Sequence, residues 1–196
     1  MESRPDPEGP AALFDEYAAD YEAAVAKGLR FAGEPSSYFA RERARWLRRR
    51  LDERQVVARS ALDFGCGTGG AVPHLIAELG AERIVGTDVS TASLATAERD
   101  HGSAGVSFAL PDALEAAAFD LANTNGVFHH IDPADRPRAL ALIANALRPA
   151  GLFAFWENNP WNPGTRLIMR SVEFDRDAQM ISAPAARRLL AASGFE

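Results

Sequence analysis

The stretch ALDFGCGTGG, residues 61–70, decides how this chain is expected to fold. A short apolar run that carries one acid, Asp63, leads into three alternate glycines, Gly65, Gly67 and Gly69. Glycines let the backbone turn sharply and come close to a ligand. A helix that follows such a turn offers free N–H groups to an anionic ligand. The stretch therefore predicts a cofactor loop, because a tight turn without a ligand would need only one glycine.

Downstream of this loop the pattern alternates between strands and helices. Strands are expected at 61–64, 83–89, 106–110, within 119–131 and at 151–158. Helices are expected at 71–80, 91–100, 134–149 and 184–194, the last two ending at Pro149 and Gly194. Such alternation indicates βαβ units with right-handed crossovers. The predicted fold class is α/β, a doubly wound, mainly parallel sheet with helices on both faces.

The N-terminal part of the chain predicts a separate cap. Residues 1–10 are polar and proline-rich and are expected to be a disordered leader, not a secretory signal. Residues 11–55 are expected to form a helical cap, with helices at 11–27 and 36–53, before a core over 56–196. The second helix carries six arginines, which predict a solvated face or, alternatively, a docking surface for an anionic acceptor: Arg41, Arg43, Arg45, Arg48, Arg49 and Arg50.

Length and composition place the chain among ordinary globular proteins. Its 196 residues suit one domain, with 47% hydrophobic and 24% charged residues. No apolar run is long enough to span a bilayer. The single cysteine, Cys66, excludes an internal disulfide. These features predict a cytoplasmic protein without a membrane partner.

Net charge and residue spacing further restrict the classes of partner and ligand that the chain is expected to bind. The formal net charge is −6, which counts against broad binding of nucleic acid, since that needs many cations along the phosphates. The four histidines and Cys66 show no metal-ligand spacing, so no metal is predicted.

The glycine pattern leaves two cofactor classes open. Gly65-x-Gly67-x-x-Gly70 matches the dinucleotide-binding pattern, and Asp88 follows at the end of the second strand. An NAD(P)-dependent oxidoreductase is therefore an alternative. That class lacks room here for a second nucleotide half, and it leaves Asp112, after the third strand, without a role.

A second pattern favours a different cofactor. Asp63-x-Gly65-x-Gly67-x-Gly69 resembles motif I of the class I S-adenosylmethionine (SAM) methyltransferases. An acid at the position of Asp88, in GTDVS, can accept hydrogen bonds from both ribose hydroxyls. The resemblance implies that Asp112, in ALPDAL, meets the adenine amino group. It implies SAM as cofactor, S-adenosylhomocysteine (SAH) as product, and a Rossmann-like methyltransferase fold. The cofactor residues expected on this basis are Asp63, Gly65, Gly67, Gly69, Asp88, Val89, Asp112, Ala113, Asn125 and Tyr17.

The flanking segments carry the same resemblance. FDLANTNGVFHHIDP (119–133) and LRPAGLFAFWEN (147–158) resemble the fourth-strand and fifth-strand segments of small-molecule methyltransferases. FDEYAADYE (14–22) resembles the helix that closes over SAM, which implies a contact from Tyr17 to the methionine carboxylate. Of Asn123 and Asn125, one is expected to be buried structure and the other to border the methionine.

Each acid and histidine also has a structural alternative. Asp88 is an alternative N-cap of the helix that follows, in competition with Ser90, and Asp112 is an alternative cap for a helix over DALEAAA. His129 and His130 are the predicted catalytic residues, with one acting as general base near the acceptor. The alternative is that one is packed and the other solvated.

A long polar segment, about 157–182, is expected to be a lid that shapes the acceptor pocket. The candidate contacts to the acceptor are Trp156, Asn158, Asn159, Trp161 and Arg166.

Together these features predict methyl transfer from SAM to an oxygen or nitrogen of a small-molecule acceptor. A SAM-binding protein that does not methylate, either a cyclase or a regulator, is an alternative that the same loop would fit. The resemblance also places a sixth strand where the chain stops, at SGFE, so end strands are expected to be missing. An open sheet edge favours association, and a homodimer is one way to cover it.

Overall fold

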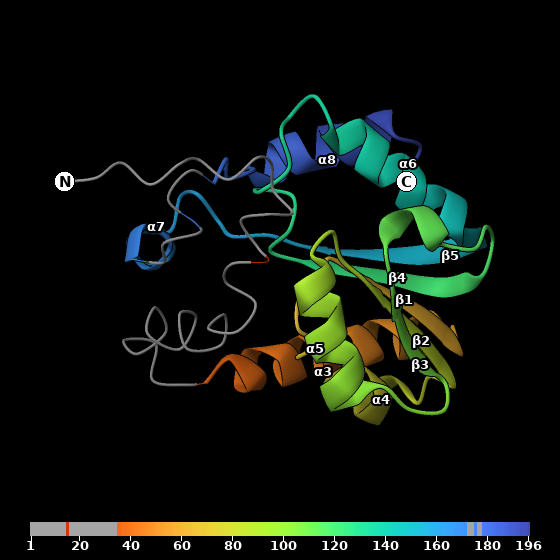
Figure 1. Cartoon of the computed structure of the whole chain (residues 1–196). Coiled ribbons are helices and arrows are strands. Elements are labelled where there is room, and N and C mark those ends of the chain that lie inside the picture. The colour runs from red at the N-terminus through yellow and green to blue at the C-terminus, as the bar shows by residue number, and fades with distance from the viewer. Residues whose placement is uncertain (1–14, 16–34, 172–174, 176–177) are drawn as a thin grey trace.

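The computed structural model describes Asp15, residues 35–171, Asp175 and residues 178–196. At the centre lies a five-stranded sheet in which every neighbouring pair of strands runs parallel (Figure 1). Across the sheet the strands are β3 (Val106–Ala109), β2 (Arg83–Thr87), β1 (Ser60–Phe64), β4 (Phe119–Asn125) and β5 (Leu147–Trp156). The predicted doubly wound, parallel α/β fold is confirmed.

Helices cover both faces of this sheet. Figure 1 shows α6 and α8 on one face and α3, α4 and α5 on the other. The helices are α3 (Ser36–Glu53), α4 (Val72–Leu79), α5 (Thr91–His101), α6 (Arg136–Ala146), α7 (Pro163–Ser171) and α8 (Ala183–Ala192). A 3₁₀ turn, η1, covers Pro111–Ala113. The predicted helix at 36–53 and the strand over 61–64 agree closely with α3 and β1.

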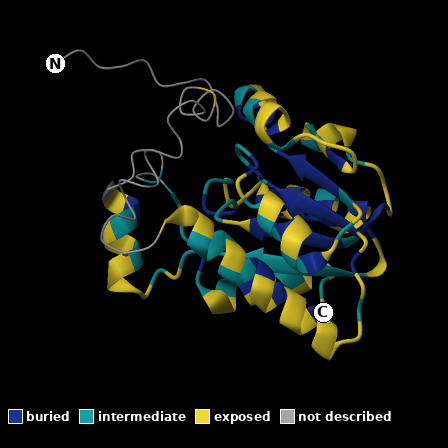
Figure 2. Cartoon of the chain, turned by 90° about the horizontal axis from the view of Figure 1, so that it is seen from below, coloured by how far each residue is buried: buried dark blue, intermediate teal, exposed yellow. Residues whose placement is uncertain are grey.

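Each face of the sheet carries its own hydrophobic core. The core beneath α6 and α8 includes Leu62, Phe119, Phe128, Leu140 and Ile143. The core beneath α3 and α4 includes Leu47, Leu51, Leu75, Ile84 and Leu121. A parallel sheet covered on both faces needs strands that are apolar along their whole length, which explains the short continuous apolar runs in the sequence. Figure 2 shows the resulting layer of buried strands between more exposed helices.

The strand order fixes where a ligand can bind. The chain proceeds from β1 outward to β3, then crosses back to place β4 on the other side of β1. Connections leave β1 and β4 toward opposite sides, so a crevice opens beyond their carboxyl ends. Asp63 in β1 pairs in register with Asn123 in β4, which brings two polar side chains to this crevice.

The predicted helix over 134–149 is too long at both ends. α6 spans Arg136–Ala146, and Leu147 leaves the helix because it pairs with Phe119 as the first residue of β5. Leu147 is buried in that position. Pro149 therefore lies within the strand segment, and Ala150 has a φ of 63° where the register shifts.

The alternative helix over DALEAAA does not form. After the single turn η1, the N–H groups of Ala117 and Ala118 donate to Asn145 O and Ala146 O at the end of α6. Because of these bonds the chain passes directly from η1 into β4. Too few residues remain between them to form another helix.

The segment predicted as a lid contains a helix that the sequence analysis missed. α7 begins after Asn162, whose side-chain Oδ1 accepts the N–H of Gly164 at 2.9 Å. An asparagine before Pro163 is a recognised helix start, since it supplies a cap and then a preset φ. α7 buries Met169.

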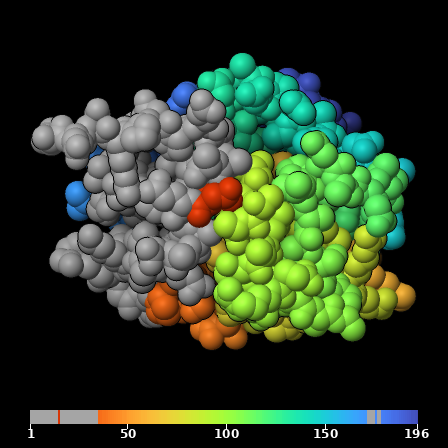
Figure 3. Space-filling view, in the orientation of Figure 1, coloured from red at the N-terminus to blue at the C-terminus, as the bar shows by residue number. Residues whose placement is uncertain are grey.

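The predicted leader and the first cap helix lie outside the described residues, except for Asp15. Asp15 lies against the start of α5 (Figure 3), where its Oδ1 accepts Ser90 Oγ at 2.5 Å and Ala92 N at 3.1 Å. Within the described residues, no helix has the length and apolarity needed to cross a bilayer.

Candidate functional site

The glycine loop is clamped to the carboxyl end of β2. The N–H groups of Gly65 and Cys66 both donate to Thr87 O, at 2.7 and 3.0 Å. Gly67 N donates to Asp88 Oδ2 at 2.9 Å, and the other carboxylate oxygen accepts Ser90 N at 3.0 Å. Asp88 therefore shapes the loop directly, by bonding to its backbone.

The three alternate glycines serve different purposes. A Cβ on Gly65 would lie 2.3 Å from Val127 Cγ2, so the loop touches the turn after β4. At Gly67, with a φ of +53°, no described atom lies within 4 Å of a built Cβ, which leaves that point open to a ligand. A Cβ on Gly69 would meet His101 and Ala97 of α5, so this glycine is turned away from the open side.

Of the two candidate caps of α5, Ser90 is the N-cap. Its hydroxyl accepts Ser93 N at 3.0 Å, while Asp88 is engaged by the glycine loop. Burial raises the pKa of Asp88, although backbone bonds from Ser90 and Gly67 act in the opposite direction. The carboxylate is thus held at the end of β2 by groups that favour its charged form.

Asp63 and Asn123 form a buried polar pair under the loop. Asn123 Nδ2 donates to Asp63 Oδ1 at 2.7 Å, and both side chains are buried. Burial raises the pKa of Asp63 to about 6, and the bond from Asn123 only partly offsets it. Asn123 is thus the buried, structural member of the asparagine pair, as the sequence predicts for one of them. Burial likewise raises the pKa of the Cys66 thiol, which makes it an inert loop residue.

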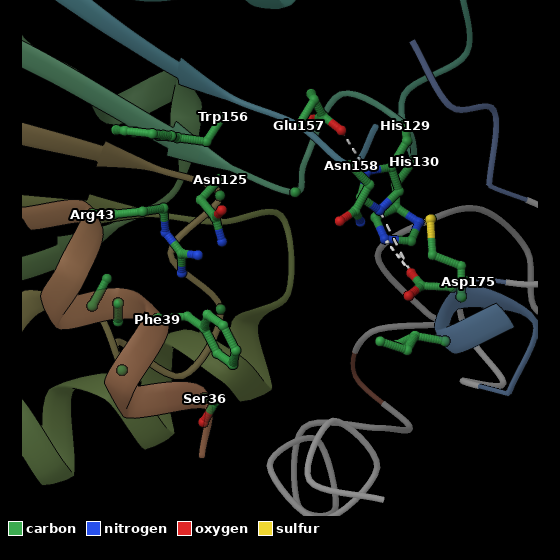
Figure 4. A pocket seen from close by; sticks show the side chains of 18 of the residues that line it. Ser36, Phe39, Arg43, Asn125, His129, His130, Trp156, Glu157, Asn158 and Asp175 are labelled. Carbon is green, nitrogen blue, oxygen red and sulfur yellow. Dashed lines mark hydrogen bonds and ion pairs between the residues drawn. The ribbon is translucent and has the colours of Figure 1, made fainter. Parts of the chain in front are cut away.

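A cavity of about 770 Å³ opens above this pair (Figure 4). Its floor is the glycine loop, with Asp63 and Asn125 at the ends of β1 and β4. Arg43 and Phe39 of α3 line one side, and residues of α7 line another. The volume and the mixed apolar and polar lining are typical of a small-molecule site.

Glu157 organises the wall after β4. Its Oε1 accepts Val127 N at 3.1 Å and Phe128 N at 2.7 Å, and its Oε2 lies 2.6 Å from His129 Nδ1. Arg136 Nε donates to Phe128 O at 3.0 Å. These bonds fix the turn that carries both predicted catalytic histidines.

His129 is 3% exposed and lies between two carboxylates. Burial by itself lowers the pKa of His129, but hydrogen bonds with Asp175 and Glu157 outweigh it and raise the pKa to about 9. At neutral pH the free ring is therefore a cation and has no lone pair with which to accept a proton. This placement makes His129 a poor general base.

His130 is the more accessible member of the pair. Its Nε2 lies 3.1 Å from Asp175 Oδ1, and its ring centroid is 4.1 Å from that of His129. Both histidines and Asp175 line the cavity. The alternative of one packed and one solvated ring does not describe the pair, since both rings face the same carboxylate.

Five predicted cofactor residues do not line this cavity: Gly69, Asp88, Val89, Asp112 and Ala113. Asp112 and Ala113 are exposed in η1, and Val89 is 47% exposed after β2. Gly69 packs on α5, as described above. Tyr17 falls outside the described residues.

The five acceptor candidates divide into two groups. Trp156 and Asn158 line the cavity at the end of β5. Asn159, Trp161 and Arg166 are exposed and do not line it, and Trp161 is 66% exposed. Asn159 instead caps a turn, because its Oδ1 accepts Trp161 N at 3.0 Å.

The sequence analysis did not single out Phe39, Glu157 and Asp175 as site residues. It named Arg43 only as one of the six arginines of a solvated face or docking surface. Glu157 had a detectable signal, since it is an acid near the end of the fifth predicted strand, 151–158, where carboxyl ends of parallel strands meet. Asp175 follows α7 in the sequence and meets the histidines only in the folded chain. No local sequence pattern marks it.

Comparisons with known proteins agree with this geometry. Residues 61–151 match the family model described as Methyltransferase domain. The chain is 35% identical over 137 residues to the ribosomal protein L11 methyltransferase of Azotobacter vinelandii, a match that covers 68% of this chain and 40% of that protein. The chain therefore spans well under half of the length of the curated relatives that it matches.

Solved structures show the same fold. A candidate O-methyltransferase of Nostoc punctiforme superposes with a TM-score of 0.68 at 16% identity, covering 100% of this chain and 57% of that one. Phosphoethanolamine N-methyltransferase 2 of Haemonchus contortus, in complex with S-adenosyl-L-methionine, gives a TM-score of 0.52 at 20% identity, covering 70% and 33%. The sheet order, the glycine loop and the family match over residues 61–151 therefore support a class I S-adenosylmethionine-dependent methyltransferase, and the solved structures show the same fold.

Proposed function

We propose that this chain moves a methyl group from SAM to an oxygen or nitrogen of a small-molecule acceptor and releases SAH. The observation that carries the proposal is a single cavity that connects the open face of Gly67 with the pair His129 and His130. A cofactor laid along the loop would therefore direct its methyl group toward a polar, enclosed wall.

The adenosine end of SAM fits the exposed surface beyond β2 and β3. We assign Asp88 to the ribose hydroxyls and Asp112 to the adenine amino group. Val89 and Leu110 expose 47% and 45% of their surface beside these acids. Register between Thr87 and Ala109 keeps the two strand ends adjacent. Exposed apolar side chains at one place suit the flat face of a base.

The methionine end fits the cavity floor. SAM carries an ammonium and a carboxylate there, and the cavity offers Asp63 and Arg43 as the matching charges. Figure 4 shows Arg43 reaching from α3 into the cavity, on the side of Asn125. We assign Arg43 to the carboxylate, alongside the predicted contact from Tyr17.

In the proposed reaction, most of the catalysis comes from aligning the methyl donor with the acceptor. The methyl donor is already a strong electrophile, so the protein mainly has to hold donor and acceptor in line. An acceptor with a high pKa must also lose a proton. We propose that the acceptor loses this proton at the group formed by His129, His130 and Asp175. His130 is the accessible member of that group.

A protein acceptor is the second candidate. The observation that favours it is the 35% identity to a methyltransferase named for ribosomal protein L11. The volume of the cavity and its mixed polar and apolar lining favour the small molecule.

The test is transfer of labelled methyl groups from SAM. Purified chain is incubated with panels of alcohols, phenols, carboxylic acids and amines, and in parallel with ribosomal protein. We expect label in a small molecule. Asp88→Ala should lower kcat/KM at least about tenfold through the KM for SAM, since charged hydrogen bonds contribute ~1.5–3 kcal/mol. Asp100→Ala, at an exposed acid paired with its neighbour Arg99, is the matched control and should have no effect.

Label found only in ribosomal protein would establish the second candidate. SAM binding without transfer to any acceptor would favour the non-methylating alternative.

A further inference from the structure

Two adjacent histidines and a distant aspartate direct their ligand atoms at one point of the cavity wall (Figure 4). His129 Nε2 lies 3.5 Å from Asp175 Oδ1, and His130 Nε2 lies 3.1 Å from the same oxygen. One ligand atom from each of the three residues falls within 4.8 Å of the others. Two imidazoles and one carboxylate are a common ligand set for divalent transition metals.

The separations fit a shared metal ion. Ligand atoms ~2.0–2.2 Å from zinc in a tetrahedral site are ~3.3–3.5 Å from one another, and octahedral neighbours are ~3 Å apart. The two nitrogen-to-oxygen distances, 3.5 and 3.1 Å, fall in this range. The two histidine nitrogens lie within 4.8 Å of each other.

Glu157 supplies the support that metal-binding histidines usually have. Its Oε2 lies 2.6 Å from His129 Nδ1, on the side of the ring opposite Asp175. A carboxylate in this position fixes the ring orientation and leaves Nε2 to face the metal. Glu157 is itself held, because its Oε1 accepts Val127 N and Phe128 N. The cluster therefore has both a ligand set and a rigid outer layer.

We propose that His129, His130 and Asp175 bind one divalent transition metal ion, such as Zn²⁺ or Mn²⁺, at the acceptor end of the cavity. The ion displaces the proton of His129 Nε2 to solvent, while Nδ1 keeps its bond to Glu157. The role that we give this ion rests on the proposed function. Three protein ligands leave coordination positions open to the cavity, where a hydroxyl oxygen of the acceptor binds. The bound hydroxyl releases its proton to solvent water. Its oxygen then forms the bond to the methyl carbon while the carbon–sulfur bond breaks, and SAH leaves with a neutral thioether sulfur.

Such a site selects a particular class of acceptor. An acceptor with two neighbouring oxygen donors, such as a catechol or an α-hydroxy acid, fills two open positions at once. Simple amines and isolated aliphatic alcohols would bind the metal less well. Neither histidine then needs to act as the base, which agrees with the enclosed position of His129.

The test measures metal binding without SAM or acceptor. The full chain is stripped with a chelator and titrated with Co²⁺, followed by visible absorption, and with Zn²⁺, followed by calorimetry. We expect one ion per chain. His130→Ala and Asp175→Asn should each weaken binding at least about tenfold, and Glu157→Gln about tenfold through its effect on His129. His74→Ala, a histidine of α4 outside the cavity lining, is the matched control and should leave binding unchanged.

Thermal unfolding of each variant is measured first, and Asp175→Asn serves if His130→Ala does not fold. Absence of a stoichiometric ion, or binding that His130→Ala and Asp175→Asn alter no more than His74→Ala does, would overturn the proposal. SAH binding to the stripped chain is measured alongside. Loss of SAH binding contradicts the proposed function, whereas loss of metal binding alone contradicts only the metal site.

Discussion

Individual residues of the site are held by partners from other strands. Asp63 is bonded by Asn123 of β4, Asp88 by the backbone of Gly67, and His129 by Glu157 after β5. Residue types and spacing predicted that Asp63 and Asp88 would lie at the same edge of the sheet, since carboxyl ends of parallel strands meet there. They did not mark Glu157 and Asp175, which line the cavity. The bonding partners could not be predicted, because they depend on the strand order.

The pKa of Asp63 gives a prediction for stability. Burial raises this pKa from 3.8 to about 6, so the folded state holds a proton that the unfolded chain releases. The resulting contribution to the free energy of unfolding is complete below about pH 4 and is lost as the pH rises through about 6. Asp63→Asn keeps the acceptor for Asn123 but does not titrate. Relative to wild type, the variant should gain about 2–3 kcal/mol between about pH 4 and pH 7.5.

Urea denaturation over this pH range measures the difference. Asp135→Asn is the control, because Asp135 is exposed at the start of α6 and its side chain makes no capping bond. A difference between Asp63→Asn and wild type that does not change with pH would show that the buried carboxyl is not what titrates.

At the scale of elements, the site depends on contact between two turns. The glycine loop after β1 touches Val127 in the turn after β4, so one turn restricts the other. Neither the loop nor the turn is long, and both are anchored to strand ends by backbone bonds.

Gly65→Ala is expected to disrupt this contact. The new Cβ would lie 2.3 Å from Val127 Cγ2, and Gly65 has a φ of +73°. A positive φ costs an alanine ~1–2 kcal/mol, and overpacking adds ~1–3 kcal/mol. Thermal or chemical unfolding should therefore show a loss of roughly 2–5 kcal/mol. Gly67→Ala is the matched control, since it has positive φ without a described neighbour, and should cost only ~1–2 kcal/mol.

The double variant Gly65→Ala, Val127→Ala separates the two causes. It should recover much of the overpacking cost, because the clashing methyl groups are removed. Equal losses for Gly65→Ala and Gly67→Ala, or no recovery in the double variant, would contradict this account of the loop.

Elements were predictable where one local signal dominates. The helix ending at Gly80 agrees with α4, whose C-cap Gly80 has a φ of 65°. The helix expected to end at Pro149 ends earlier, because pairing of Leu147 with Phe119 outcompetes another helical turn. α7 was missed because a long polar segment was interpreted by composition alone, although Asn162 and Pro163 mark its start.

At the scale of the whole molecule, the order β3-β2-β1-β4-β5 creates the site. It brings the loop after β1, the turn after β4 and the end of β5 around one cavity. Alternation of strands and helices predicted the fold class and the edge at which a ligand binds. The cluster of His129, His130 and Asp175 was not predictable, because Asp175 follows α7 in a part of the chain without a local signal.

The homodimer and the closing cap remain predictions at this scale. β5 forms one edge of the described sheet. The ring of Phe195 packs against that of Phe153 in this strand, with the two ring centroids 5.0 Å apart. Of the N-terminal part of the chain the structure describes Asp15, which bonds to Ser90 and Ala92 at the start of α5.

The central claim is that the glycine loop and cavity bind SAM, and calorimetric titration tests it most directly. Purified chain is titrated with SAM, with SAH and with NADH, and Asp88→Ala is titrated with SAH. The account predicts one micromolar site for SAM and for SAH, no binding of NADH, and SAH binding weakened at least about tenfold in Asp88→Ala. Binding of NADH in place of SAM and SAH, or SAH affinity unchanged in Asp88→Ala, would contradict it.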